Sequence, residues 1–261
     1  MKVYATYNIK GGVGKTTTAV NLAYLAAREG RRTLLWDLDP QAAATYLFRV
    51  RPRVKGGSHA LVTRRWPLEA ALKATDFDNL DLLPADFSYR NMDLDLDDTK
   101  KRTRRLGKLL NSVADDYDMV FLDCPPSVSL VSENVLHASD TLLVPLIPAT
   151  LSLRTLDQLT RFVADSEGSR PEIVAFFSMA DRRKRLHREV IDTIARDGTR
   201  IADTVIPSLS MIEQMAERRA PVPAFAPASR AAQCYERLWA EVRPGNDVSA
   251  SRVHQGLTWD E

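Results

Sequence analysis

A glycine-rich segment close to the start of the chain carries the most specific chemical signal in the sequence. Residues 10–17 read KGGVGKTT and lie between an apolar run that favours a strand and a segment with helical spacing. Glycines let backbone N–H groups turn toward phosphate oxygens, and the following helix directs its positive end at the same anion. We expect Lys15 to reach the β- and γ-phosphates and the Thr16 hydroxyl to bind Mg²⁺. The residues predicted to contact the nucleotide are Lys10, Gly11, Gly12, Val13, Gly14, Lys15, Thr16 and Thr17.

Three carboxylates stand where apolar runs end. Asp37 and Asp39 close the run TLLWDLD, and Asp123 closes the run DMVFLD. Ligands of open α/β sheets lie beyond the carboxyl ends of the strands, so we expect these acids beside the glycine-rich loop. Asp37 and Asp39 are two residues apart and would share one face of a strand. Asp123 is in the Walker B position, where it would hold the metal through water. The predicted Mg²⁺ ligands are Thr16, Asp37, Asp39 and Asp123.

Apolar runs alternate with amphipathic segments along the chain. The short runs predict strands at residues 3–8, 32–38, 80–84, 118–123, 141–145 and 173–177. Helical spacing predicts helices at residues 17–29, 101–114, 152–165, 186–196 and 228–242. This alternation predicts an α/β fold of the P-loop NTPase type, with a mostly parallel twisted sheet and helices on both faces. Residues 49–66 are basic, contain adjacent glycines and show no period, so we expect a mobile loop or a broken helix there.

Composition narrows the class of protein. No linker rich in Pro, Gly or Ser divides the 261 residues, so we expect one domain over residues 1–243 and a polar, flexible tail at residues 244–261. The chain has 36 basic and 34 acidic residues, so any contact with nucleic acid requires a local basic patch. Two cysteines form neither a disulfide framework nor a zinc motif. The sequence shows no signal peptide and no apolar run long enough to span a membrane, which predicts a cytoplasmic protein.

The motifs quoted above resemble those of one family, the ParA/MinD group of deviant Walker A ATPases. The hallmark of this family is a second lysine at the front of the loop, and Lys10 stands at that position. The resemblance continues in WDLDPQAAAT, in LDCPPS and in FSMADRRKRLHREVIDTI. It extends through VIPSLSMIEQMAERRAPVPAFAPASRAAQCYERLWAEV and so covers roughly residues 1–242. Ala42 stands where the family usually has glycine, and Ser208 stands where many members have arginine.

The resemblance implies an ATPase that dimerises when it binds ATP. Lys10 would cross the dimer interface and supply positive charge to the ATP of the other subunit, as an arginine finger does. Asp39 would position the attacking water, so Lys10, Lys15 and Asp39 are the implied catalytic residues. ATP and Mg²⁺ are the implied cofactors, and hydrolysis in this family is slow. Pro207, after the apolar residues TVI, is the implied contact of the adenine.

The ParA-like branch of the family implies three partners. They are a second copy of the chain when ATP is bound, nonspecific DNA, and a ParB-like or cargo-adaptor protein that stimulates hydrolysis. The protein would then be associated with the nucleoid, and its cargo would be a plasmid, a chromosome or a protein assembly. We expect a short member of the family without an N-terminal helix-turn-helix domain. Contacts with phosphates need only clustered Arg and Lys. The predicted DNA contacts are Arg182, Arg183, Lys184, Arg185, Arg218, Arg219 and Arg230.

Three other functions stay open. A MinD-like protein would coat membranes through a C-terminal amphipathic helix, whereas residues 244–261 have no sustained apolar face. A metabolic enzyme on the same fold would be an ATP-dependent amide ligase, with a second substrate pocket, or an iron protein like that of nitrogenase. Cys124 and Cys234 do not match the cluster-bridging cysteines of such an iron protein. The third alternative is a binding module that does not hydrolyse ATP, which measurable turnover would exclude.

Overall fold

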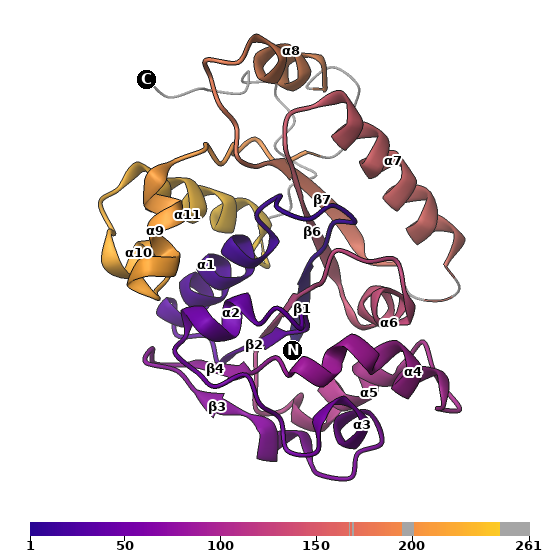
Figure 1. The fold of residues 1–261 in the computed structure, drawn as a ribbon. Helices are drawn as coiled ribbons and strands as arrows, with labels where there is room; N and C mark the ends of the chain where they lie inside the picture. Colours follow the sequence, from indigo (N-terminus) through magenta and orange to yellow (C-terminus); the bar gives the residue numbers. More distant parts are fainter. Residues whose placement is uncertain (167, 169, 195–200, 246–261) are drawn as a thin grey trace.

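The computed structural model describes residues 1–166, 168, 170–194 and 201–245. Over these residues the chain folds around a seven-stranded sheet (Figure 1). The strands are β1 (Lys2–Thr6), β2 (Thr33–Asp37), β3 (Lys73–Ala74), β4 (Leu80–Leu83), β5 (Met119–Asp123), β6 (Thr141–Leu146) and β7 (Glu172–Phe177). They lie in the order β3-β4-β2-β5-β1-β6-β7, and only β3 pairs antiparallel with its neighbour. The predicted α/β fold with a mostly parallel sheet is confirmed.

Helices cover both faces of this sheet (Figure 1). The helices on one face are α1 (Lys15–Arg28), α2 (Ala43–Leu47), α9 (Ser210–Arg218), α10 (Val222–Phe225) and α11 (Arg230–Val242). The helices on the other face are α3 (Gly57–Val62), α4 (Met92–Asp97), α5 (Arg105–Leu110), α6 (Leu130–Ala138), α7 (Thr150–Asp165) and α8 (Arg185–Ile194). The 3-10 helices are η1 (Leu68–Ala71), η2 (Phe87–Asn91) and η3 (Asn111–Val113).

Alternating side chains of the interior strand β1 belong to two separate hydrophobic cores. Tyr4 belongs to the core beneath α1 and α11, where its ring stacks on Phe121 with 5.2 Å between the centroids. Val3 and Ala5 belong to the core on the other face. Because a parallel sheet is covered on both faces, its strands are apolar at successive positions rather than at alternate ones. This explains why the predicted strands read as short continuous apolar runs.

The basic segment 49–66 contains a short helix, in agreement with the broken helix and not with the mobile loop. Helix α3 occupies its centre, and Leu61 and Val62 are buried in the core. Gly56 and Gly57 both adopt positive φ angles, of 77° and 64°, and turn the chain into the helix. A Cβ atom on Gly57 would lie 2.6 Å from the Ser88 Oγ, so the close approach of η2 also requires glycine.

Several predicted boundaries were wrong. The helix expected over residues 101–114 is α5, which begins only at Arg105, where the Asn134 side chain accepts the backbone N–H groups of Arg105 and Leu106. The sequence analysis missed α6 and α9 as separate helices. Residues 246–261 of the predicted tail lie outside the described residues. Within the described part of the chain, no helix is long and apolar enough to cross a membrane.

Candidate nucleotide site

The glycine-rich loop joins β1 to α1 at the carboxyl edge of the sheet. Gly12 and Gly14 adopt φ angles of 68° and 94°, which are costly for residues that carry a Cβ atom. A Cβ atom on Gly14 would also lie 2.8 Å from the Oγ of Ser178, the residue that follows β7. Glycine at position 14 therefore permits both the turn of the loop and its contact with the end of β7.

Backbone contacts connect the two lysines of the loop. Asn8 is buried, and its side chain accepts the Lys10 N–H at 2.9 Å and donates to the Pro145 carbonyl at 2.8 Å. The Lys10 carbonyl in turn accepts a hydrogen bond of 2.9 Å from the Lys15 Nζ. Asn8 thus fixes the entrance of the loop to β6. The sequence analysis missed this residue, whose only signal is its place directly before the loop.

The Lys15 ammonium group is buried next to acidic side chains. Lys15 is 7% exposed, and this burial lowers its pKa, an effect that the charges of Asp123, Cys124 and Asp39 oppose. A buried ammonium group favours an anionic ligand, because the charge needs a partner where water cannot supply one. The Thr18 hydroxyl donates to the Gly14 carbonyl at 2.7 Å and so fixes the first turn of α1 behind the loop.

Asp123 lies at the centre of the carboxyl edge, at the end of β5. Strand register places it beside Thr6 of β1 and Asp37 of β2. Its side chain is fully buried, and its Oδ2 has no hydrogen-bond partner among the described residues. Burial raises the pKa of Asp123 well above its usual value, and the charge of Asp37 adds to this effect. A metal ion with its bound water would satisfy such an oxygen, so the arrangement fits the predicted Mg²⁺ site.

Asp37 and Asp39 do not share a strand face, contrary to the prediction. Strand β2 ends at Asp37, and Asp39 lies in the loop that follows. The Asp37 Oδ2 accepts the N–H and the hydroxyl of Thr45 at 2.8 and 2.7 Å, and its Oδ1 accepts the Asp39 N–H at 3.2 Å. Burial raises the pKa of Asp37 to about 6. Asp37 therefore anchors α2, whereas Asp39 is only partly buried and accepts the Gln41 N–H at 2.9 Å.

The described residues contain no group of three His, Cys, Asp or Glu side chains that could hold a metal ion by themselves. Mg²⁺ is commonly held by one or two carboxylates, with waters and substrate phosphates at its other positions. Thr16 is the second residue of α1, and its side chain interacts with the Asp123 carboxyl group. Thr16 and Asp123 therefore fit the metal better than Asp37, whose oxygens are already engaged. The metal-binding roles stay predictions.

Helix α2 connects the carboxyl edge to α9. Ala42 precedes α2 with a φ angle of 58°, so a side chain occupies the left-handed region where the family usually has glycine. The Tyr46 carbonyl accepts a hydrogen bond of 2.9 Å from the Arg219 Nε, and the guanidinium group lies 4.4 Å from the centroid of the Tyr46 ring. Arg49 donates to the Arg218 carbonyl at 3.2 Å. The predicted DNA contact Arg219 therefore packs against α2.

The other predicted DNA contacts lie before and along α8, at the end of α9 and at the start of α11. Arg183 forms an ion pair with Asp181 at 3.0 Å, and Arg185 forms one with Glu189 at 2.6 Å. The Asp181 N–H donates to the Nδ1 of the buried His187 at 3.0 Å, which closes the loop that carries these cations. The further members of the predicted set are Arg182, Lys184, Arg218 and Arg230. Their role with DNA stays a prediction.

Pro207 lies beside the segment that follows β7. It forms an isolated parallel bridge with Ala180, whose carbonyl accepts the Ser208 N–H at 2.9 Å. Because Ser178 contacts Gly14, this segment places Pro207 on the same side of the sheet edge as the loop. The contact of Pro207 with adenine stays a prediction.

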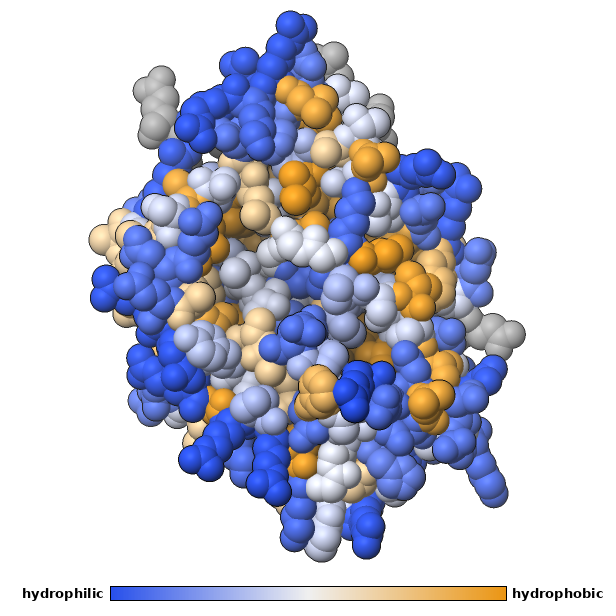
Figure 2. Space-filling model, viewed as in Figure 1, coloured by the Kyte–Doolittle hydropathy of each residue, from blue (hydrophilic) through white to orange (hydrophobic). Residues whose placement is uncertain are grey.

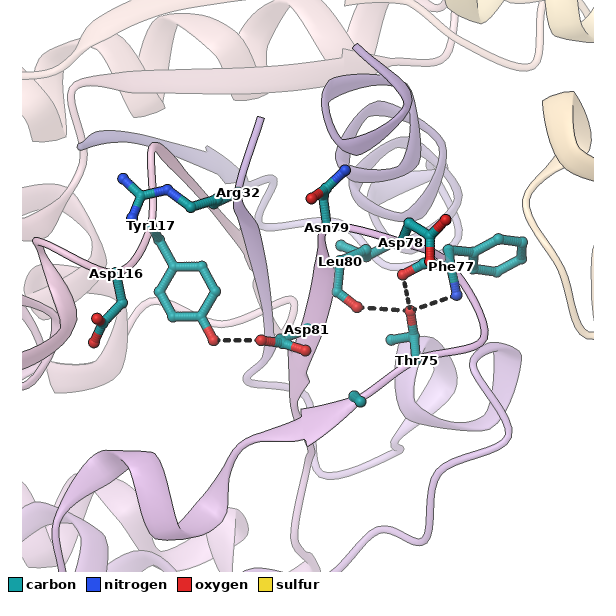
Figure 3. Close-up of a pocket in the computed structure, with 10 residues that line it drawn as sticks. Arg32, Thr75, Phe77, Asp78, Asn79, Leu80, Asp81, Asp116 and Tyr117 are labelled. Carbon is teal, nitrogen blue, oxygen red and sulfur yellow. Dashed lines mark hydrogen bonds between the residues drawn. The ribbon is translucent and has the colours of Figure 1, made fainter. Parts of the chain in front are cut away.

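A cavity of about 410 Å³ lies at the amino edge of the sheet, away from the loop (Figure 3). Arg32, Asn79 and Asp81 are among its lining residues. The Tyr117 hydroxyl, which also lines it, donates to the Asp81 carboxylate at 2.7 Å. None of the residues predicted to bind nucleotide or metal contributes to this cavity, so it is not the nucleotide site.

Comparison with known proteins agrees with the geometry of this edge. Residues 1–173 match a family model described as an AAA domain. The chain is 34% identical to the sporulation initiation inhibitor protein Soj of Bacillus subtilis, over 92% of this chain and 98% of that protein. It is 34% identical to the chromosome partitioning protein ParA of Caulobacter vibrioides, over 93% of this chain and 94% of that protein.

A solved structure shares the fold as well. Cobyrinic acid a,c-diamide synthase from Mycobacterium smegmatis, with bound ADP and magnesium, is 28% identical and has a TM-score of 0.77. The alignment covers 92% of this chain and 93% of that one. The family model covers the loop at residues 10–17 and the strands β1 to β6. This protein therefore belongs to the ParA/MinD-type family of P-loop ATPases.

Proposed function

We propose that this protein is a ParA-like switch that dimerises with ATP, binds DNA nonspecifically and positions or segregates a cargo. ATP and Mg²⁺ are its cofactors, and hydrolysis to ADP and phosphate resets the switch. The burial of the Lys15 ammonium group inside the loop carries this proposal, because a buried cation held by the Lys10 carbonyl fits the phosphates of a nucleotide. The unpartnered Oδ2 of Asp123 lies at the same edge of the sheet.

Each residue of the edge has a distinct task in this proposal. Lys15 and the backbone N–H groups of the loop bind the phosphates, and Thr16 and Asp123 hold the metal. Bound Mg²⁺ would neutralise charge on the β- and γ-phosphates. Asp39 orients the attacking water, and Lys10 acts on the nucleotide of the second subunit. Asp37 keeps α2 in place through its hydrogen bonds to Thr45.

The names of the similar proteins support the partners that we propose. A protein named for chromosome partitioning is 34% identical over nearly the whole chain, which supports action on a plasmid, a chromosome or a protein assembly. We propose that intrinsic hydrolysis is slow and that a ParB-like or cargo-adaptor protein stimulates it. The protein would act in the cytoplasm on the nucleoid. The basic residues around α8 and α9 would contribute phosphate contacts.

Retention on nonspecific duplex DNA tests this function. The wild-type protein should be retained with ATP and Mg²⁺ and released with ADP. Lys15→Ala should abolish ATP turnover, and Asp39→Ala should lower turnover by about 10²-fold or more while retention with ATP persists. Equal retention with ATP and ADP would contradict the switch. ATP turnover that survives Lys15→Ala would contradict the assigned site.

An amide ligase is the second candidate, because a structure named as a diamide synthase is 28% identical to this chain. A ligase consumes ATP only when its carboxylic acid substrate and a nitrogen donor are present. Turnover of ATP without either, with no new amide detected by mass spectrometry when cobyrinic acid and glutamine are added, would exclude it. Turnover that depends strictly on both would replace the switch by a ligase.

Action on membranes is the remaining alternative on this fold. It would require an amphipathic helix near the C-terminus, and residues 246–261 lie outside the described residues. Co-sedimentation with anionic lipid vesicles in the presence of ATP would support that alternative. We expect the protein to stay in the supernatant under the same conditions in which it binds DNA.

A further inference from the structure

The basic stretch at residues 49–66 takes no part in the function proposed above. Residues 49–66 contain six Arg or Lys side chains and no acidic side chain, although the whole chain has almost equal numbers of both. All six are exposed, and five of them lie around the two ends of α3. We call these five residues the α3 patch: Arg51, Arg53, Lys55, Arg64 and Arg65.

The cations of the α3 patch form no ion pairs with the described residues, and Asp86, which acts on the charge of Arg53, is the acidic side chain near them. Arg49, outside the patch, pairs with Asp76 at 3.0 Å, whereas no member of the patch forms an ion pair with any residue that the structure describes. Asp86, the carboxylate beside the patch, accepts the Val54 N–H at 2.8 Å and the Ser88 N–H at 2.9 Å. Its two oxygens thus hold the backbone under the patch and do not form an ion pair there.

Aromatic rings position the cations at this end of the molecule. The Lys55 Nζ lies 3.8 Å from the centroid of the Trp66 ring, which is 41% exposed. This contact joins the loop before α3 to the loop after it, so the two halves of the patch form one surface. The neighbouring Arg90 lies 4.1 Å from the centroid of Phe87. Each ring has a cation over one face, and this contact limits the motion of the charged group.

Among the large apolar side chains of residues 49–66, only Trp66 is exposed, and it lies against the Lys55 ammonium group. Protein interfaces depend on buried aromatic or aliphatic anchors surrounded by a polar rim. Around α3 the large apolar side chains such as Leu61 and Val62 are buried in the protein, and the exposed Trp66 and Phe87 are engaged by cations. Clustered, unpaired cations without an apolar anchor favour a polyanion recognised by charge alone.

We propose that the α3 patch binds the phosphate backbone of duplex DNA, as a second contact surface besides the residues around α8 and α9. This inference rests on the DNA binding proposed above and names a surface for it. In Figure 1, α3 and α8 lie at opposite ends of the molecule, and Figure 2 shows strongly hydrophilic residues over both ends. The α3 patch and the residues around α8 are therefore separate, and each can be removed without the other.

A charge-matched pair of variants tests this assignment. The patch variant carries Arg51→Gln, Arg53→Gln, Arg64→Gln and Arg65→Gln. The control variant loses the same charge from exposed positions before β2, on α7 and before β7, through Arg31→Gln, Arg154→Gln, Arg161→Gln and Arg170→Gln. Fluorescence anisotropy of a labelled nonspecific duplex, with ATP and Mg²⁺, gives the dissociation constant over a series of salt concentrations.

We expect the patch variant to bind DNA more than tenfold more weakly at roughly 0.1 M salt, with a shallower dependence of log K on log salt. The slope should fall by about 0.9 for each phosphate that the variant no longer neutralises. The control variant should stay within about twofold of the wild type. Lysine at the same four patch positions should retain most of the affinity, which separates loss of charge from loss of folding. ATP turnover without DNA should be unchanged in all variants.

The outcomes separate this inference from the proposed function. If the wild-type protein does not bind DNA with ATP, the DNA-binding part of the proposed function fails, and this inference fails with it. If the wild type binds and the patch variant binds equally well, only the inference fails. Binding of a labelled polyglutamate peptide to the wild type and to the patch variant is measured in the same way. Loss of peptide binding with unchanged DNA binding would assign the patch to an acidic protein and overturn the proposal.

Discussion

The α3 patch and the basic residues around α8 and α9 are two cationic surfaces of one molecule with different neighbours. Around α8, Arg183 pairs with Asp181 and Arg185 pairs with Glu189. Near α9, Arg219 donates to the Tyr46 carbonyl and lies over its ring. In the α3 patch, Lys55 lies over the ring of Trp66, and no patch cation forms an ion pair with the described residues, although the charge of Asp86 acts on Arg53. Clusters that look alike in the sequence thus present different net charge to an anion.

This difference matters because binding to phosphates depends on uncompensated charge. An exposed ion pair is weak, so DNA can compete for its arginine, but the neighbouring carboxylate still repels the phosphates. A cation without an acidic neighbour releases counterions from DNA with no such opposition. The comparison therefore predicts that the α3 patch contributes more to DNA affinity than an equal number of cations around α8.

Removal of equal numbers of cations from the two surfaces should give the largest difference in DNA affinity. Removal of four cations around α8, through Arg183→Gln, Lys184→Gln, Arg185→Gln and Arg188→Gln, should weaken DNA binding by only about threefold. The corresponding loss in the α3 patch should exceed tenfold, because its cations are unpaired. Anisotropy titrations of both variants at one salt concentration measure this. The opposite order would show that pairing within the protein does not decide which surface DNA selects.

Arg219 should affect stability more than DNA binding. Arg219→Ala removes a hydrogen bond to the end of α2 and a cation–aromatic contact, so we expect the free energy of unfolding to fall by about 1–1.5 kcal/mol. Arg218→Ala is the matched control, because only the backbone carbonyl of Arg218 is engaged, and Arg49 retains that bond. Its cost should stay within about 0.5 kcal/mol. Urea unfolding of both variants decides whether Arg219 belongs to α2 or to the DNA surface.

The two surfaces should respond differently to acid. Burial lowers the pKa of His187, and the charge of Lys184 adds to this effect. Its Nδ1 accepts the Asp181 N–H only in the neutral form, so this hydrogen bond is complete above the usual histidine pKa of about 6.5. It is lost as the pH falls through the lower pKa of the folded protein, at a cost of about 1 kcal/mol.

Amide hydrogen exchange measures this response at single residues. After correction for intrinsic rates, the Asp181 amide should lose protection between pH 7 and pH 5. The Val54 amide in the α3 patch region, which is held by the Asp86 carboxylate, is the control and should keep its protection over this range. Parallel changes at both amides would indicate global unfolding and would contradict a local effect of His187.

Removal of the carboxylate partner of one arginine should have the smallest effect on DNA affinity. Glu189→Gln removes the carboxylate that pairs with Arg185 and should tighten DNA binding by about twofold to threefold. Asp157→Asn is the control, because it releases Arg161 from an equivalent pair four residues apart on α7. Its effect should stay within about 1.5-fold, because α7 is outside both surfaces. Equal gains in both variants would mean that net charge, and not the location of the arginine, controls affinity.

Local patterns in the sequence predicted a large part of the fold. Continuous apolar runs identified the buried parallel strands, and helical spacing identified α1, α7 and α11. The pattern did not reveal α2, because its five residues are too few to show a period and Ala42 precedes it in a conformation typical of glycine. Nor did it predict that the basic segment around Gly56 and Gly57 contains a helix with a buried side, because the six residues of α3 are too few to show a period.

The site was predictable where its residues are contiguous and not where they meet from distant segments. Residues 10–17 and Asp123 could be read directly, because their chemistry depends on neighbours in the sequence. Thr45 could not, because its bonds to Asp37 and to the Ala85 N–H depend on how α2 packs against β2 and β4. The face shared by Asp37 and Asp39 was wrongly expected, since a strand pattern does not reveal where the strand ends.

The mass of the protein in solution tests the central claim, dimerisation driven by ATP, most directly. Multi-angle light scattering should report a monomer with ADP and Mg²⁺ and twice that mass with ATP and Mg²⁺. Lys10→Ala should bind ATP with nearly unchanged affinity and remain a monomer, because the implied contact of Lys10 is with the other subunit. A wild-type mass that is the same with both nucleotides would contradict the account.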